Sequence, residues 1–339
     1  MLATAVAALP WMIHAQGPEL RFDGRMPPEV ERIYERGLSW LADHQTEQGN
    51  WNDGQSGAGV DGICLMAFLA SGEDPNFGRY APNIRRALRA MISSQDPETG
   101  YLPNSMYHHG FAMLALSEAY GVVDDSLIAR DGGGKNGAGM RSIGQALDLA
   151  IRCAVTSQEK NRWGAWRYSP DSTDADTSVA GAVLMGLLAA RNAGMEVPDE
   201  SIDAALDYMR RSTGKNGFVA YSGGFGGMGE SMNRSAIATL VHAVAKQKDV
   251  WQYEATLKHI TERLEHQADG HYLEYFRYYM AQALFQGDYQ AWQKWNTATI
   301  RQLENTQAED GSIGQTPYQT GMSLLALGLN YRFLPIYER

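Results

Sequence analysis

Two aspartates stand directly before an apolar run in the segment 171–187, which reads DSTDADTSVAGAVLMGL. A carboxylic acid that its surroundings keep protonated can deliver a proton to a substrate. Asp176 is therefore a candidate catalytic acid, with Asp174 as the residue that tunes it. Asp, Ser and Thr are also well suited to begin a helix, because their side-chain oxygens accept free backbone N–H groups. Capping is the commoner role, and the sequence leaves the choice between the two open.

The elements that would position these residues form a repeat. Amphipathic helices, with apolar residues three and four positions apart, alternate with helices that are apolar on all sides, and the pair recurs six times. Segments 33–41 and 84–91 are amphipathic, whereas 62–72 and 110–121 are apolar throughout. A helix that is hydrophobic on every face must be surrounded by protein. The pattern predicts an all-α fold, an α/α toroid or (α/α)6 barrel, with an apolar inner ring inside an amphipathic outer ring.

A polar turn that contains glycine follows each amphipathic helix. In the first turn Gln45, Gly49 and Trp51 have the spacing Q-x-x-x-G-x-W, and the segment 158–166, QEKNRWGAW, is a looser copy. The aromatic ring can cover the turn, while the glutamine amide can bond free groups at helix ends. This pattern resembles the QW repeat of the terpenoid cyclase and protein prenyltransferase superfamily. The chain looks most like its single-toroid proteins with prenyltransferase and squalene oxidase repeats.

The resemblance implies a role for the two aspartates. Class II terpenoid cyclases carry a D-x-D-D-T type segment, in which an aspartic acid protonates an alkene or an epoxide. Here DADTS places Asp174 on the first acidic position and Asp176 on the proton donor. Thr177 stands where the squalene cyclases have a further Asp. The ligand that this resemblance implies is a polyprenyl or triterpenoid-like molecule.

Metal and cofactor chemistry is not expected. Protein prenyltransferases bind zinc through an Asp-x-Cys pair and a distant His, whereas Asp61 and Cys64 have two residues between them and YQTGM stands in the place of that His. His108 and His109 are adjacent in a helix and diverge by about 100°, so they would not face one metal ion together. The sequence therefore predicts no metal and no cofactor.

A shared mouth is the expected place for a ligand. If the six apolar helices run in one direction, as a regular repeat requires, their N-terminal ends meet at one end of the toroid. A concave place with acids, an arginine and several tyrosines is the default binding site. Besides Asp174 and Asp176, the candidates at this mouth are Asp61, Tyr107, His108, His109, Glu230, Asn233, Arg234, Tyr272, Glu274, Tyr275, Tyr318 and Gln319.

Charge and composition exclude several kinds of partner. The 339 residues carry a formal net charge of -10 with scattered Lys and Arg, so no basic field would gather nucleic acid. Cys64 and Cys153 are too few for a disulfide framework or a Cys-based zinc cluster. No apolar segment is long enough to span a membrane.

The N-terminal stretch predicts a leader in front of the toroid. Residues 1–15 read MLATAVAALPWMIHA, an apolar stretch that ends in a small residue and favours a signal peptide with export to the periplasm. No Lys or Arg precedes the apolar run, so a cytoplasmic protein is the alternative. We expect 16–29 to be an extension and 30–339 a single toroid domain.

Three functions are open to such a toroid. One is a cyclase-like protein that acts on, or binds, a small hydrophobic molecule with Asp176 as acid. Another is a non-catalytic toroid that binds a ligand, a peptide or a partner protein. The third is a carbohydrate-active barrel, in which Asp61 together with Asp176 or Glu230 flanks a glycosidic bond of a glycan. A deep apolar chamber favours the first function, and a shallow polar groove with exposed tyrosines favours a sugar or a peptide.

Overall fold

The computed structural model describes residues 26–52, 57–131, 140–223, 227, 229–265, 272–331 and 334–337. The expected signal peptide at 1–15 and most of the expected extension at 16–29 lie outside these ranges. Within them the regular secondary structure is helical, and the strand-like pairings are two isolated bridges, Asp176 with Ser222 and Thr213 with Val219. No helix of the described residues is long and apolar enough to cross a bilayer.

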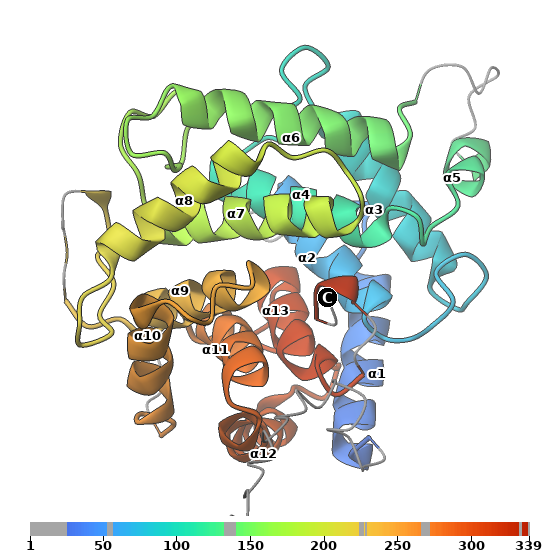
Figure 1. Cartoon of the computed structure of the whole chain (residues 1–339). Coiled ribbons are helices and arrows are strands. Elements are labelled where there is room, and N and C mark those ends of the chain that lie inside the picture. Colours follow the sequence, from blue (N-terminus) through green and yellow to red (C-terminus); the bar gives the residue numbers. More distant parts are fainter. Residues whose placement is uncertain are drawn as a thin grey trace, which may run out of the picture.

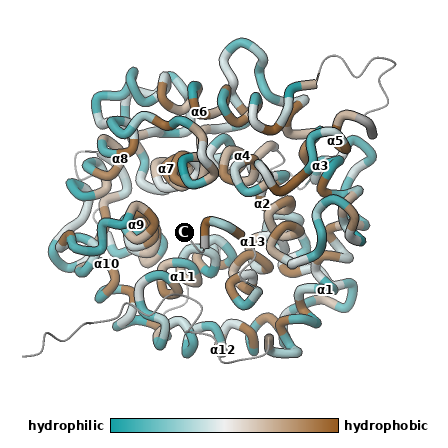
Figure 2. Tube along the Cα trace, turned by 45° about the vertical axis from the view of Figure 1, so that its right-hand side comes forward, coloured by the Kyte–Doolittle hydropathy of each residue, from teal (hydrophilic) through white to brown (hydrophobic). Residues whose placement is uncertain are grey.

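Six consecutive helix pairs form two concentric rings, as Figure 1 and Figure 2 show. The outer helices are α1 (Pro28–Asp43), α3 (Ala81–Ser94), α6 (Ile143–Glu159), α8 (Asp199–Ser212), α10 (Trp251–Thr261) and α12 (Tyr289–Thr306). The inner helices are α2 (Ala58–Leu69), α4 (Met106–Ala119), α7 (Thr177–Asn192), α9 (Met232–Val244), α11 (Leu273–Gly287) and α13 (Pro317–Gly328). A short helix α5 (Asp125–Asp131) and a 3-10 turn η4 (Pro335–Tyr337) are added to the pairs. The predicted all-α toroid is confirmed.

The inner ring is closed and apolar. Each inner helix packs on the next one along the chain, and α13 packs back on α2. Every residue of α2 is buried, whereas α1 buries one stripe. Glycine allows the closest approach in the ring: a Cβ on Gly110 of α4 would lie 2.6 Å from the backbone of Ala182 in α7. The alternation of amphipathic and apolar helices thus follows directly from their places in the two rings.

Turn glutamines join each unit to the next. The amide of Gln45 donates to the Gly49 carbonyl of its own turn at 2.8 Å and to the Asn83 carbonyl in the first turn of α3 at 3.0 Å. The same two-bond pattern recurs at Gln95, Gln158 and Gln307. These amides therefore link neighbouring units, instead of satisfying free groups at helix ends as the sequence suggested. The corresponding turn of the fifth unit, 266–271, lies outside the described residues.

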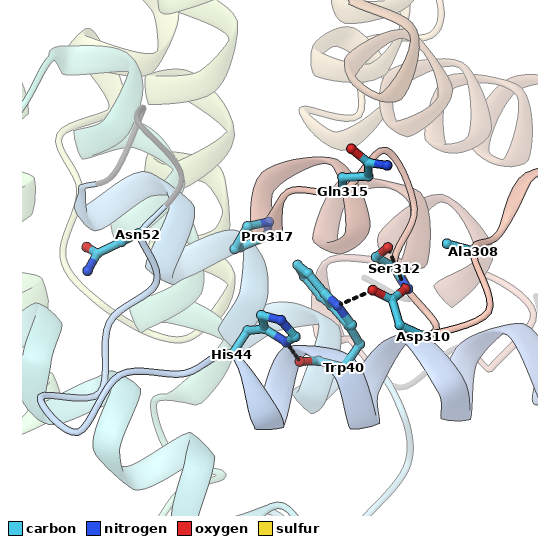
Figure 3. A pocket seen from close by; sticks show the side chains of 8 residues that line it. All are labelled: Trp40, His44, Asn52, Ala308, Asp310, Ser312, Gln315 and Pro317. Carbon is cyan, nitrogen blue, oxygen red and sulfur yellow. Dashed lines mark hydrogen bonds between the residues drawn. The ribbon is translucent and has the colours of Figure 1, made fainter.

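The ring closes where the last unit meets the first. Gln307 donates to a carbonyl of α1 at 3.0 Å, and the Trp40 indole N–H donates to the Asp310 carboxylate at 3.2 Å (Figure 3). Arg36 donates to two carbonyls of the turn 308–309. Polar contacts from α1 to one turn therefore add to the packing of α13 on α1 and α2 at the seam between the two ends of the repeat.

The C-terminal segment lies over the opposite end of the inner helices. Leu334 and Ile336 are buried, and η4 contacts α7. The backbone N–H of Ile336 donates to the carboxylate of Glu118, near the C-terminal end of α4, at 3.4 Å. Residues 334–337 thus cover the last turns of α4 and α7 at the end of the ring where the inner helices finish.

The glutamine that closes the ring provides a first test. Gln307→Ala removes two hydrogen bonds and leaves two carbonyls short of a donor, so the free energy of unfolding should fall by about 1–3 kcal/mol. Gln293→Ala, at an exposed position of α12, is the matched control and should change stability by less than about 0.5 kcal/mol. Urea unfolding followed by circular dichroism measures both. Equal losses in the two variants would contradict a special role for Gln307.

Candidate functional site

The N-terminal ends of all six inner helices meet at one cavity of about 660 Å³. Helix N-termini bring the positive end of the helix dipole to this place, and side chains cap the first N–H groups of α4, α7, α9 and α13. Its lining residues in the inner helices are Gly59, Val60, Ile63, Tyr107, His108, Ser178, Val179, Asn233, Arg234, Glu274, Tyr275, Tyr318 and Gln319. Tyr168, Tyr221, Ser231, Tyr272 and Thr316 complete the lining from the loops. We call it the mouth cavity.

The structure brings together many of the residues named from the sequence. Those that line the mouth cavity are Tyr107, His108, Asn233, Arg234, Tyr272, Glu274, Tyr275, Tyr318 and Gln319. Those that it places elsewhere are Asp61, His109, Asp174, Asp176 and Glu230. Each of these five has a role that the described contacts make clear.

Asp61 holds a turn together. It is 5% exposed, and its carboxylate accepts the backbone N–H of Trp51 at 2.9 Å. The indole of Trp51 is itself buried and donates to the Leu41 carbonyl at 2.8 Å. Contrary to the expectation, Asp61 faces the first turn instead of the cavity, because the backbone of that turn supplies its partner.

His109 lies in the core between two units. Its Nδ1 accepts the backbone N–H of Leu102 at 3.1 Å, which leaves Nε2 to donate to the Ala150 carbonyl at 3.0 Å. Burial lowers the pKa of this imidazole to about 4, although the hydrogen bond to Ala150 acts in the opposite direction. His109 is therefore a neutral structural residue, and its neighbour His108 is the histidine that faces the cavity.

Asp174 and Glu230 are paired outside the cavity. The carboxylate of Asp174 lies 2.7 Å from the Arg167 guanidinium, and its side chain is 56% exposed. Glu230 lies 3.1 Å from Arg263 and 3.6 Å from the ring of His259. Both carboxylates pair with cations near the surface. The expectation that they line the mouth is therefore wrong.

Asp176 begins α7 and is completely buried. Its Oδ1 accepts the backbone N–H groups of Ser178 and Val179 at 2.8 and 3.0 Å. Its Oδ2 is buried as well, and a side-chain hydrogen bond joins the Asp176 carboxyl group to the Tyr221 phenol. The capping role considered from the sequence is thus present, and Asp176 is also bonded to Tyr221, a residue that lines the cavity.

The charge of Asp176 acts on groups that line the mouth cavity. Burial lowers the pKa of Arg234, and the nearby Asp176 partly restores it. Arg234 is also held in place, because its guanidinium donates to the carbonyls of Val219, Gly227 and Gly229. A hydrogen bond with Tyr168, burial and Asp176, in that order, raise the pKa of the Tyr221 phenol. The raised pKa keeps the Tyr221 phenol a neutral hydrogen-bonding group at ordinary pH.

Aromatic rings form the floor of the mouth cavity. Tyr107 lies 5.9 Å from Tyr275 and 5.0 Å from Phe111, measured between ring centroids. Tyr279 continues the cluster, 4.8 Å from Tyr275 and 4.9 Å from Tyr278. Phe111, Tyr278 and Tyr279 are each at most 3% exposed. The centre of the ring beneath the cavity is therefore filled by rings rather than by an open apolar chamber.

Exposed tyrosines stand at the rim, and two of them were missed by the sequence analysis. Tyr168, Tyr221 and Tyr272 are 49%, 36% and 66% exposed. The guanidinium of Arg167 lies 6.0 Å from the ring of Tyr168 and 5.8 Å from that of Tyr221. The sequence search considered the first turns of the inner helices, whereas Tyr168 and Tyr221 lie in the loops before them. Tyr272, which the sequence analysis did name, also lies just before an inner helix. The same position could have pointed to Tyr168 and Tyr221.

Metal ligands do not converge in the part of the chain that the structure describes. No three side chains of His, Cys, Asp or Glu there are placed to hold one metal ion.

No protein-family model and no curated protein matches this chain. Solved structures do match. An inactive variant of an α-1,6-mannanase of Salegentibacter sp. HEL1_6, in complex with α-1,6-mannotriose, has a TM-score of 0.62 at 9% identity, over 90% of this chain and 99% of that one. The α-mannanase BT2949 of Bacteroides thetaiotaomicron has a TM-score of 0.57 at 11% identity, over 89% of this chain and 96% of the other.

A terpene cyclase matches equally well. A variant of the type II terpene cyclase MstE from Scytonema, in complex with its substrate geranylgeranyl dihydroxybenzoate, has a TM-score of 0.61 at 12% identity, over 91% of this chain and 99% of that chain. At such identities the likeness shows the fold alone. The resemblance to cyclases is therefore supported at the level of the α/α toroid, which cyclases and mannanases share.

His109 gives the site region a pH-dependent stability. Its pKa of about 4 lies below the ordinary 6.5, so the unfolded chain binds a proton in this range that the folded protein does not. The free energy of unfolding should fall as the pH drops from about 6.5 towards 4. Between about pH 7 and pH 4.5, the free energy of unfolding of His109→Gln should fall by about 2–3 kcal/mol less than that of the unchanged protein. Urea unfolding at both pH values measures this, with His44→Gln at an exposed position as control. The same pH dependence in both variants would contradict the assignment.

Proposed function

We propose that this protein is a non-catalytic toroid that binds a glycan chain in its mouth cavity. One observation carries the proposal. The cavity wall combines tyrosine rings with neutral hydrogen-bonding groups, such as Asn233, Gln319 and Ser178. A sugar presents C–H faces that pack on aromatic rings, and hydroxyls that pair with amides and hydroxyl groups. The exposed rings of Tyr168 and Tyr272 at the rim extend this surface outwards.

The carboxylates support binding in preference to cleavage. Glycosidases commonly use two carboxyl groups that flank the scissile bond. Among the described residues that line the mouth cavity, Glu274 is the one carboxylate, and Arg277 lies 3.9 Å from it. The pairs expected from the sequence, Asp61 with Asp176 or with Glu230, do not line the cavity. The inactive Salegentibacter mannanase carries Asp→Asn changes at two adjacent positions, and adjacent aspartates do not occur in this lining.

A cyclase is the second candidate, because one observation favours it. The carboxyl group of Asp176 is completely buried next to Tyr221 and Tyr275, two residues that line the mouth cavity, so an acid at this place would lie close to a bound ligand. Two features weigh against it. Oδ1 of Asp176 accepts two backbone N–H groups, which is the capping role, and aromatic rings pack beneath the cavity in place of an open apolar chamber.

The rim tyrosines test the glycan proposal. Tyr168→Ala and Tyr272→Ala each remove an exposed stacking surface, so the affinity for a bound oligosaccharide should fall about 2- to 10-fold. The probes are α-1,6-linked mannose, β-1,4-linked glucose and β-1,4-linked N-acetylglucosamine oligomers, measured by isothermal titration calorimetry. Trp251→Ala, an exposed ring on the outer helix α10, is the matched control and should bind as tightly as the unchanged protein. If none of the three series binds, the proposal fails.

Asp176→Asn separates the two candidates. Asn caps helices as well as Asp and can accept the same backbone N–H groups, but it cannot donate an acidic proton. We expect the glycan affinity to change by less than about twofold. In parallel, mass spectrometry would follow squalene and geranylgeranyl-bearing phenols incubated with the protein. A cyclised product made by the unchanged protein and lost in Asp176→Asn would favour the cyclase instead.

A further inference from the structure

A second polar pocket lies beside the mouth cavity, at the seam of the ring. It has a volume of about 350 Å³ and lies between the end of α1 and the turn before α13 (Figure 3). Its lining includes Trp40, His44, Asp310, Ser312, Gln315 and Pro317. We call it the seam pocket.

The segment 315–318, which includes the extended residue Thr316, separates the seam pocket from the mouth cavity. Gln315 and Pro317 line the seam pocket, whereas Thr316 and Tyr318 line the mouth cavity. Thr316 has the extended dihedral angles φ -126 and ψ 152, and successive side chains of an extended backbone point to opposite sides. The wall between the two spaces is therefore one chain thick, so a linear ligand could lie across it.

The seam pocket has the same mixture of groups as the mouth cavity. The exposed ring of His44 stacks on the ring of Trp40, with centroids 4.0 Å apart and an interplanar angle of 22°. Trp40 is fixed in turn by its hydrogen bond to Asp310. The backbone and hydroxyl of Ser312 donate to Asp310 and lower the pKa of its carboxyl, so an ionised acceptor lies beside the stacked rings. Such a surface offers a ring face and an acceptor for sugar hydroxyls before any ligand arrives.

The backbone at the wall is strained. Gln315 is an exposed residue with φ of 68°, in the left-handed region that few residues other than glycine adopt. Such strain persists only where the surroundings impose it, and it gathers at functional sites. Here it places the Gln315 side chain at the pocket (Figure 3).

We propose that the mouth cavity and the seam pocket are two subsites for one linear glycan, which crosses the segment 315–318 and is held at both places. This inference rests on the proposed function. It implies that the preferred ligand is an extended chain, and that a short oligosaccharide fills the mouth cavity alone.

The test compares a disaccharide with a hexasaccharide from the series that binds most tightly in the panel above. His44→Ala removes the exposed ring, and Gln315→Gly removes the side chain while glycine accepts the positive φ freely. We expect both variants to bind the hexasaccharide about fivefold more weakly and the disaccharide within about twofold of the unchanged protein. Trp251→Ala is the control for both lengths.

The outcomes separate this inference from the proposed function. If the unchanged protein binds the hexasaccharide no better than the disaccharide, or if His44→Ala and Gln315→Gly weaken both lengths equally, the two-subsite inference is overturned while glycan binding stands. If neither oligosaccharide binds the unchanged protein, the proposed function has failed and the inference with it.

Discussion

A turn glutamine that donates to a carbonyl of its own unit and to one of the next unit is the contact on which the ring depends. The described fourth turn lacks this glutamine, and there the hydroxyl of Ser235 in α9 donates to the Gly217 carbonyl of its own unit at 2.8 Å. The packing there is equally close, since a Cβ on Gly217 would lie 2.4 Å from the Ala255 carbonyl oxygen. In the four units that carry it, the glutamine thus ties one unit to the next, and the packing of the inner helices brings their N-terminal ends to one mouth.

The two ends of the toroid consequently differ in chemistry. At the mouth the helices present polar first turns and the positive ends of their dipoles, so this end is suited to hydrogen-bonding ligands. At the other end the segment 334–337 lies over the last turns and bonds to Glu118. Together with the aromatic rings beneath it, this gives the mouth cavity a lining that mixes tyrosine rings with polar groups, which is the feature on which the glycan proposal rests.

Asp176 shows why capping and catalysis were hard to separate. The position that begins an inner helix is also the position nearest the mouth, so one carboxylate can serve either purpose. In this structure the backbone N–H groups of Ser178 and Val179 occupy one oxygen, and the other is enclosed. Asp174, two residues earlier, is turned out to Arg167.

The sequence by itself determined the helix pairs, which helix of each pair is inner, and the gathering of residues such as Asn233 and Tyr318 at one end. Periodicity of apolar residues and turn glycines are local signals, and they are sufficient for these conclusions. Only the tertiary structure decided that His108 faces the cavity while His109 enters the core, and that loops bring in Tyr168 and Tyr221. Packing against the neighbouring helices fixes the rotation of each helix about its own axis. Adjacent side chains on a helix differ by about 100° in direction, so this rotation decides which residue of the first turn faces the cavity. The sequence of one unit alone does not contain that information.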